Sequence, residues 1–174
     1  MLVAVLALGA CGGPAEPAGP PPFNSVDVMF LQMGLEQIKD GDQVAALAEQ
    51  RATGAELRAL TTELRGQWRT ESGTMQRWLL GWQQPLVPDP NVSAHAGHGD
   101  LHSLRSSDLD ELRAARGPDF DRTALSLLLG HLHNCVDTAR MESAGGGYPP
   151  ARSFADAMTR TRQGQIQRML VLAA

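Results

Sequence analysis

Residues 120–142 read FDRTALSLLLGHLHNCVDTARME, and this stretch decides the fold that the chain is expected to adopt. Its apolar residues recur three and four positions apart, a spacing that brings side chains onto one face of an α-helix. The helix is expected to run from near Asp119 to about Glu142, because GGGYPP at 145–150 would stop it. The residues that share its inner face are Phe120, Ala124, Leu127, Leu128, His131, Cys135 and Thr138.

The same periodicity predicts three further long helices, and strand-type alternation is absent from the sequence. These helices are expected from 24 or 25 to a break near 53–54, from about 55 to 82, and from about 151 to 172. A short helix is expected at 108–116, with Ser107 as its cap and Asp110 closing a capping box. Arg160, Arg162 and Arg168 are spread around the last helix, which predicts a solvated face. The fold class is therefore all-α.

The two halves of the chain match without a gap when one is shifted by 94 residues. The matches fall on the predicted buried stripes of both halves, which favours two similar helical hairpins at about 24–82 and 119–172. Two such hairpins predict a four-helix bundle with a pseudo-twofold axis, in which 83–118 is the connector. The identical pairs are Asp27 with Asp121, Leu31 with Leu125, Leu35 with Leu129, Ala45 with Ala139, and Met75 with Met169.

Composition excludes several classes of protein. The chain has 174 residues and a net charge of −4, and its Lys and Arg residues form no cluster, so a nucleic-acid partner is not expected. No apolar run reaches the roughly 18 residues that a spanning helix needs. Two cysteines cannot form a disulfide framework, although they leave open one disulfide, one metal site or two unrelated roles.

The N-terminal stretch predicts where the protein resides. Residues 2–10 read LVAVLALGA, and Leu8-Gly9-Ala10-Cys11 matches a lipobox, the motif that directs lipid attachment to a cysteine. We therefore expect a lipoprotein signal peptide at 1–10, a Gly/Pro-rich tether at 11–22 and a bundle domain at 23–174. The protein would be extracytoplasmic and lipid-anchored to the cell membrane through Cys11. A frayed apolar terminus with an incidental cysteine is the alternative.

The chain resembles the ferritin-like family called "domain of unknown function 305". The resemblance rests on DVMFLQMGLEQIKDGDQVAALA at 27–48, RTESGTMQRWL at 69–79, DLDELRAARGPDFDR at 108–122 and QGQIQRM at 163–169. It implies a four-helix bundle, a secreted or lipid-anchored location and, for some members, a link to copper handling. Where the family has Pro-His-His, this chain has Glu36-Gln37-Ile38 and Gly130-His131-Leu132. One of the four histidines that the family leads us to expect is therefore present, His131.

A metal site at the centre of the bundle is the first candidate for chemistry. His131 and Cys135 are one helical turn apart on the inner face of their helix. Imidazole, thiolate and thioether donors suit Cu(I), so copper is the cofactor that these residues favour. The alternative is that they are core residues, since Met fills gaps and Cys packs as a small hydrophobe. The thioether donors of the candidate site are Met29, Met33, Met75 and Met169.

The connector carries a second candidate metal site, within HAGHGDLH at 95–102. His95, His98, His102 and Asp100 have spacings that are compatible with binding Zn²⁺ or Cu²⁺. The alternative is a solvated polar loop, since its two glycines would make ordering costly.

Enzymatic activity has no positive support in the sequence. A di-iron centre needs Glu-x-x-His motifs, which are absent, and no nucleophile motif is present. Two hypotheses remain. One is a membrane-anchored protein that binds a metal ion, with copper as the expected metal. The other is a non-catalytic lipoprotein that has lost its metal ligands and acts by packing against a partner or itself.

Overall fold

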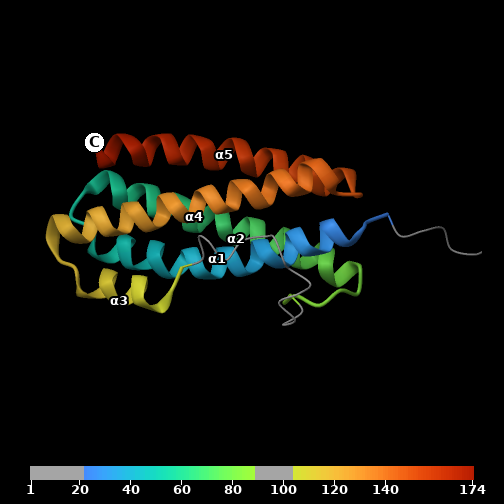
Figure 1. Cartoon of the computed structure of the whole chain (residues 1–174), viewed down its shortest axis with the longest axis horizontal. Helices are drawn as coiled ribbons and strands as arrows, with labels where there is room; N and C mark the ends of the chain where they lie inside the picture. Colours follow the sequence, from blue (N-terminus) through green and yellow to red (C-terminus); the bar gives the residue numbers. More distant parts are fainter. Residues whose placement is uncertain (1–21, 89–103) are drawn as a thin grey trace, which may run out of the picture.

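Four long helices and one short helix form the structure, a computed structural model that describes residues 22–88 and 104–174. In Figure 1 the long helices lie side by side, with the short one against one end. No strand occurs in the described parts, so the prediction of an all-α four-helix bundle is confirmed. The helices are α1 (Ser25–Arg51), α2 (Ala55–Gly81), α3 (Ser106–Ala114), α4 (Gly117–Gly145) and α5 (Pro149–Ala173).

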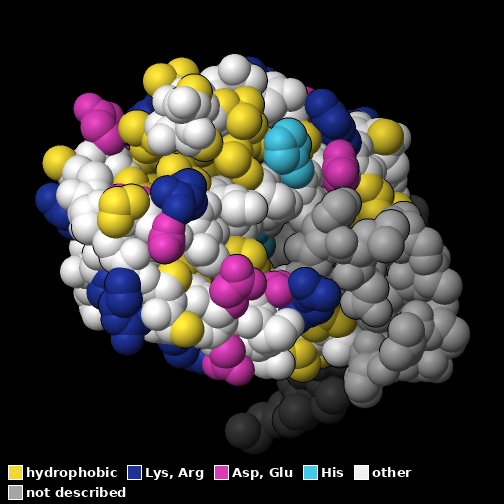
Figure 2. All heavy atoms as spheres, turned by 60° about the vertical axis from the view of Figure 1, so that its left-hand side comes forward, with side chains coloured by type: hydrophobic (Ala, Val, Ile, Leu, Met, Phe, Trp, Pro, Cys, Tyr) yellow, Lys and Arg dark blue, Asp and Glu magenta, His cyan; other side chains and the backbone are white. Residues whose placement is uncertain are grey.

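The two hairpins, α1–α2 and α4–α5, pack through α1 and α4, which run antiparallel. Near one end the Asn24 side chain donates to the carbonyl of Gly145 (2.9 Å), and near the other the Arg51 guanidinium lies over the Phe120 ring. The bundle therefore has two distinct ends. The α3 end holds α3, the α1–α2 turn and the start of α4, while the opposite end holds the start of α1, the end of α2 and the α4–α5 turn (Figure 1). Figure 2 turns the α3 end toward the reader.

The observed helix ends agree with those predicted from the sequence, except at the start of α3. Asn24 and Asp27 form the capping box of α1. At α3 the predicted cap is wrong, because the helix begins one residue before Ser107 and the N-cap is Arg105. Asp108 lies three residues beyond that cap and accepts from the Arg105 backbone N–H (3.0 Å) and from its guanidinium. The Arg105–Asp108 ion pair therefore stabilises the start of this helix.

Two apolar clusters fill the bundle, one toward each end. Toward the α3 end the cluster includes Leu64, Phe120, Leu128 and Met169, and toward the other end it includes Phe30, Leu79 and Met158. Between them, at mid-length, lies a set of buried polar side chains that contributes to neither cluster. This central polar layer consists of Gln67, Glu71, His131, Cys135, Arg162 and Gln165, of which Gln67 is half-buried.

Candidate functional site

The central polar layer contains the predicted pair from α4. Sγ of Cys135 lies 3.6 Å from Nε2 of His131, and both side chains are buried. Residues four apart on a helix stack on one face, which is why the sequence could predict this contact. The pair is therefore preformed inside the bundle.

His131 is enclosed by the first hairpin. An ideal Cβ built on Gly41 of α1 would lie only 2.4 Å from Nε2, so a residue with a side chain does not fit opposite the imidazole. From α2 the Trp68 ring packs edge-on against the imidazole, with 5.8 Å between the centroids. Burial, and secondarily the charge of Arg162, lowers the pKa of His131 to about 4. The imidazole is thus neutral near pH 7 and keeps a lone pair for a soft cation.

Cys135 is a protonated thiol in this layer. Burial raises its pKa to about 11, although the nearby Arg162 guanidinium acts in the opposite direction. The sequence predicted Arg162 on a solvated face, and this prediction is wrong because the side chain is fully buried. The sequence could not predict this burial, because the position of Arg162 on its own helix does not show that an acidic partner lies on another helix.

Arg162 is held by an ion pair between α5 and α2. Its guanidinium bonds to the Glu71 carboxylate and donates to Oε1 of Gln165 (3.3 Å). Gln67 Nε2 donates to Glu71 (2.9 Å), and Gln165 Nε2 donates to Gln67 (2.7 Å), so the polar groups form one network. Nε of Arg162 stays buried without a partner. A positive charge therefore already occupies the bundle centre beside His131 and Cys135.

The four methionines do not all gather around the pair. Met75 packs against Gly34 in the apolar cluster on one side of the polar layer, and Met169 belongs to the cluster on the other side. Met29 and Met33 are half-buried on α1. Within the described residues no three His, Cys, Asp or Glu side chains cluster as metal ligands.

The other candidates of the sequence analysis fall elsewhere. His95, His98, His102 and Asp100 lie outside the described residues, as does Cys11. His133 is exposed. Gln37, which occupies a family histidine position in the first half, donates to Oγ1 of Thr138 (2.8 Å).

A second buried polar pair, at the start of α1 and the end of α4, was missed by sequence reasoning. Glu142 is fully buried, no donor reaches either of its oxygens, and the Asp27 carboxylate lies beside it. Burial, and then the Asp27 carboxylate, raises the pKa of Glu142 to about 8. Burial also acts to raise the pKa of Asp27, but hydrogen bonds from three backbone N–H groups bring it below its usual value. The protonated Glu142 can therefore donate to Asp27.

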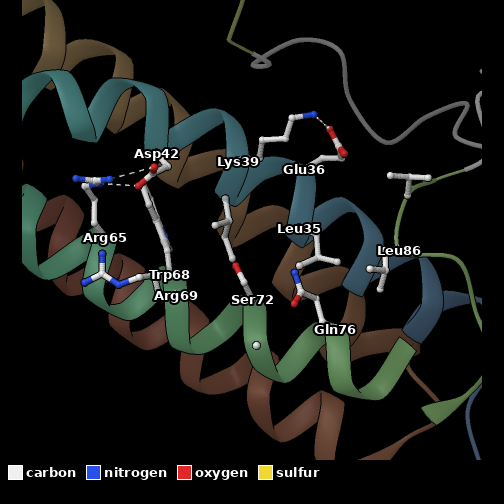
Figure 3. A pocket seen from close by; sticks show the side chains of 13 residues that line it. Leu35, Glu36, Lys39, Asp42, Arg65, Trp68, Arg69, Ser72, Gln76 and Leu86 are labelled. Carbon is white, nitrogen blue, oxygen red and sulfur yellow. Dashed lines mark hydrogen bonds and ion pairs between the residues drawn. The ribbon is translucent and has the colours of Figure 1, made fainter. Parts of the chain in front are cut away.

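A groove of about 620 Å³ lies between α1 and α2 (Figure 3). Charged side chains surround it, and Arg65 donates to Asp42 across its end (2.7 Å). Trp68 lines the groove on one side and contacts His131 with the same ring, and its Nε1 is buried without a partner. The Trp68 ring therefore lies between the groove and His131.

Comparisons with known proteins agree with this architecture. The family model described as "Domain of unknown function (DUF305)" matches residues 27–173, whereas no curated protein matches the sequence significantly. Among solved structures, a DUF305 protein from Streptomyces coelicolor is 19% identical with a TM-score of 0.77, over 85% of this chain and 91% of that chain. A DUF305 fragment from Deinococcus radiodurans is 21% identical with a TM-score of 0.76, over 88% and 98%.

A third structural neighbour has been solved with metal ions. CopM in its Cu(II)-bound form is 22% identical with a TM-score of 0.69, over 84% of this chain and 95% of CopM, and Cu(I)-bound and Ag-bound forms also match. At these identities the likeness shows the fold. In the described residues, no helix of this chain is long and apolar enough to cross a membrane.

Proposed function

The chain belongs to the DUF305 family, and from this premise we propose that it is an extracytoplasmic, lipid-anchored protein that binds copper without catalysis. The observation that carries the proposal is the 3.6 Å separation between His131 Nε2 and Cys135 Sγ in the middle of the bundle. Two donors on one tetrahedral ion, with metal–nitrogen and metal–sulfur bonds as for zinc, lie about 3.5 Å apart. The pair thus has the spacing of two ligands to a single ion.

The chemistry of the donors favours a soft ion. A neutral imidazole and a thiolate, with thioethers on neighbouring helices, are the donors that select Cu(I). Since the Cys135 thiol keeps its proton near neutral pH, binding would release that proton. Met29, Met33, Met75 and Met169 remain candidate thioether donors, although Met75 and Met169 lie in the apolar clusters on either side of the polar layer.

The relatives and the groove also support the proposal. CopM has been solved with Cu(II), Cu(I) and silver bound on the same fold. In this chain the groove between α1 and α2 leads to Trp68, whose ring contacts His131. Movement of the Trp68 ring would connect the groove with the pair, so the groove is the proposed path for the ion.

The anchor is proposed from the lipobox at Cys11 and the Gly/Pro-rich tether that follows it. A family relative from Streptomyces coelicolor is described as secreted, which supports the same compartment. Expression in a bacterial host with labelled fatty acid tests the anchor. The wild type should carry label and sediment with membranes, whereas Cys11→Ala should carry none. Label on neither protein would contradict the anchor.

A second candidate is a bundle that binds no metal and acts by packing against a protein partner or a second copy. Arg162 is the observation that favours it, because its buried guanidinium opposes a second cation near His131 and Cys135. Metal analysis of the protein isolated from its native host separates the two candidates. About one copper per chain supports the first, and the absence of copper supports the second.

The connector histidines are a separate proposed site for Zn²⁺ or Cu²⁺. A chain with His95 and His98 replaced by alanine should lose this binding and retain copper in the bundle. Metal binding that vanishes entirely in this variant would place the copper of the native protein in the connector and contradict the bundle site.

A further inference from the structure

Five aromatic rings gather at the end of the bundle opposite α3. Phe23 stacks on Trp82 with 4.3 Å between centroids and 13° between the planes. The Tyr148 ring lies edge-on to Trp78 and Trp82, with centroids 5.7 and 5.2 Å away, and Phe154 lies edge-on to Trp78. All five rings are half-buried, at the point where α1 begins, α2 ends and α5 begins. We call this surface the aromatic end.

The surface of the aromatic end consists of uncharged residues that cover the buried Asp27 carboxylate. Residues 22–26, 78–88 and 143–151, which form it, contain no Asp, Glu, Lys or Arg. Two large apolar side chains are exposed there, Leu80 at 62% and Val87 at 59%, and Val87 also lines the groove between α1 and α2. In contrast, Figure 2 shows acidic and basic side chains spread over the α3 end. The charged residues near that end include Arg51, Glu56, Arg58, Arg113, Arg116, Asp119, Asp121 and Arg122.

The fold itself does not require these aromatic residues. The two hairpins are related by a shift of 94 residues, so residues 22–26, 78–80 and 143–151 of the aromatic end have equivalents in the other repeat. Phe23 corresponds to Gly117, and Tyr148 corresponds to Gly54. At the α3 end these two positions are glycines and the Phe120 ring is buried, so the architecture does not require half-exposed rings at its ends.

We propose that the aromatic end is a membrane-contact surface that rests on the lipid interface, so that the bundle stands on the bilayer. Tryptophan and tyrosine favour this interface because their rings are apolar and their N–H and O–H groups reach water. Leu80 and Val87 would enter the acyl-chain boundary. Arg77 and Arg152, which adjoin the uncharged ranges in the sequence and are exposed, would contact the lipid phosphates.

The short distance in sequence between Cys11 and the aromatic end favours a membrane over a protein as the partner of this surface. This inference rests on the proposed lipid anchor, because Cys11 precedes Phe23 by only 12 residues and Phe23 lies at the aromatic end. Twelve residues span at most about 40 Å when fully extended. An anchor at Cys11 would therefore keep the aromatic end within about 40 Å of the bilayer, whereas the α3 end lies a further helix length of about 40 Å along the bundle.

Quenching of tryptophan fluorescence by lipids with brominated acyl chains tests the proposal on the full lipid-modified chain. Vesicles of phosphatidylethanolamine and phosphatidylglycerol should reduce the emission, because Trp78 and Trp82 are near the interface. Trp68 is buried at mid-bundle and should not be quenched. The variant Leu80→Glu/Val87→Glu should lose most of the quenching while its thermal unfolding stays unchanged.

A matched variant at the other end serves as the control. Leu170→Glu/Val171→Glu also replaces two exposed apolar residues near the C-terminus, and it should be quenched like the wild type. Equal quenching of both variants, or no quenching of a wild type whose Cys11 carries lipid, would overturn the proposal. Self-association that requires Leu80 and Val87 and occurs without vesicles would overturn it as well.

The mass of the Cys11 peptide separates this inference from the proposed anchor. If Cys11 carries no lipid, the anchor fails, and the surface is still tested by flotation of the unmodified chain with vesicles. Flotation that is lost in Leu80→Glu/Val87→Glu but kept in Leu170→Glu/Val171→Glu would support the membrane-contact surface. Flotation that does not distinguish the two variants would refute it.

Discussion

Asp27 and Asp121 perform the same task at opposite ends of the bundle. Asp27, at the start of α1, accepts hydrogen bonds from the backbone N–H groups of Gly147 and Tyr148 in the α4–α5 turn (both 2.9 Å). Asp121, at the start of α4, accepts from Thr53 and Gly54 in the α1–α2 turn (2.9 and 2.8 Å). Each aspartate therefore ties its own hairpin to the turn of the other.

Loss of either aspartate should destabilise the protein to a different degree. Asp27→Ala should cost about 3 kcal/mol, because the buried Asp27 carboxylate is the charged acceptor of the backbone N–H groups of Asn24, Gly147 and Tyr148. Asp121 is only half-buried, so water can replace it, and Asp121→Ala should cost about 1–2 kcal/mol. Urea unfolding measures both. Asp119→Ala, at an exposed carboxylate, should change the free energy of unfolding by less than about 0.5 kcal/mol, and equal costs for all three would contradict the shared role.

The aspartate pair explains why so much of the fold could be predicted. Asp27 and Asp121 are matched by the 94-residue shift, and so are the turn residues that they bind, so the sequence repeat is also a structural repeat. Helix spacing and the glycine and proline breaks predicted the long helices within a few residues. The start of α3 was missed because Arg105 is not an ordinary cap, and the Asp108 contact that supports it is a side-chain pair.

Gly41 should tolerate no side chain. In Gly41→Ala the new Cβ would collide with His131 Nε2 and with the Trp68 ring, which lies 2.8 Å from the ideal Cβ position. Such overpacking should cost about 1–3 kcal/mol, measured by thermal or urea unfolding. Gly164→Ala on α5 meets nothing within 4 Å and should stabilise the protein by up to about 1 kcal/mol. If Gly41→Ala were as stable as Gly164→Ala, the enclosure of His131 would be refuted.

The buried Glu142 should make stability fall as pH rises. Its folded pKa is about 8 and the ordinary pKa of a glutamate is 4.5, so between these values the folded state holds a proton that the unfolded state has released. His131 acts in the opposite direction between its folded pKa of about 4 and its ordinary pKa of 6.5, so the effect of Glu142 is expected alone between pH 6.5 and 8. The free energy of unfolding should fall there by up to about 1.4 kcal/mol per pH unit.

Glu142→Gln isolates this effect, because the amide is neutral at every pH and can donate to Asp27. Its unfolding free energy should be flatter than that of the wild type from pH 6.5 to 8, as followed by urea titrations at several pH values. The same slope in both proteins would show that Glu142 is already ionised in the fold.

Removing one partner of the ion pair in the polar layer should lower the free energy of unfolding strongly, whereas replacing both partners should lower it much less. Arg162→Met leaves Glu71 buried without its cation and should cost about 3–5 kcal/mol. The double variant Arg162→Met/Glu71→Gln should recover most of this loss. Arg168→Met removes a half-exposed partner of Glu63 and should cost less than about 1 kcal/mol. A double variant as unstable as Arg162→Met would contradict the pairing argument.

The candidate site was less predictable than the fold for a physical reason. His131 and Cys135 were found because both lie on one helix, where spacing alone places them together. Arg162, Glu71 and the Asp27–Glu142 pair depend on contacts between helices, which helical periodicity does not report. The methionines show the same limit, since Met75 and Met169 share an inner face of their helices but belong to separate clusters.

The most direct test of the account is a Cu(I) titration of the purified chain against a competing chelator. We predict one Cu(I) per chain, bound more tightly than micromolar, with the affinity reduced at least about tenfold in His131→Ala and in Cys135→Ser. His133→Ala, next to the pair but exposed, and the His95→Ala/His98→Ala variant should bind like the wild type. Binding no tighter than micromolar that is unchanged by His131→Ala would contradict the copper site.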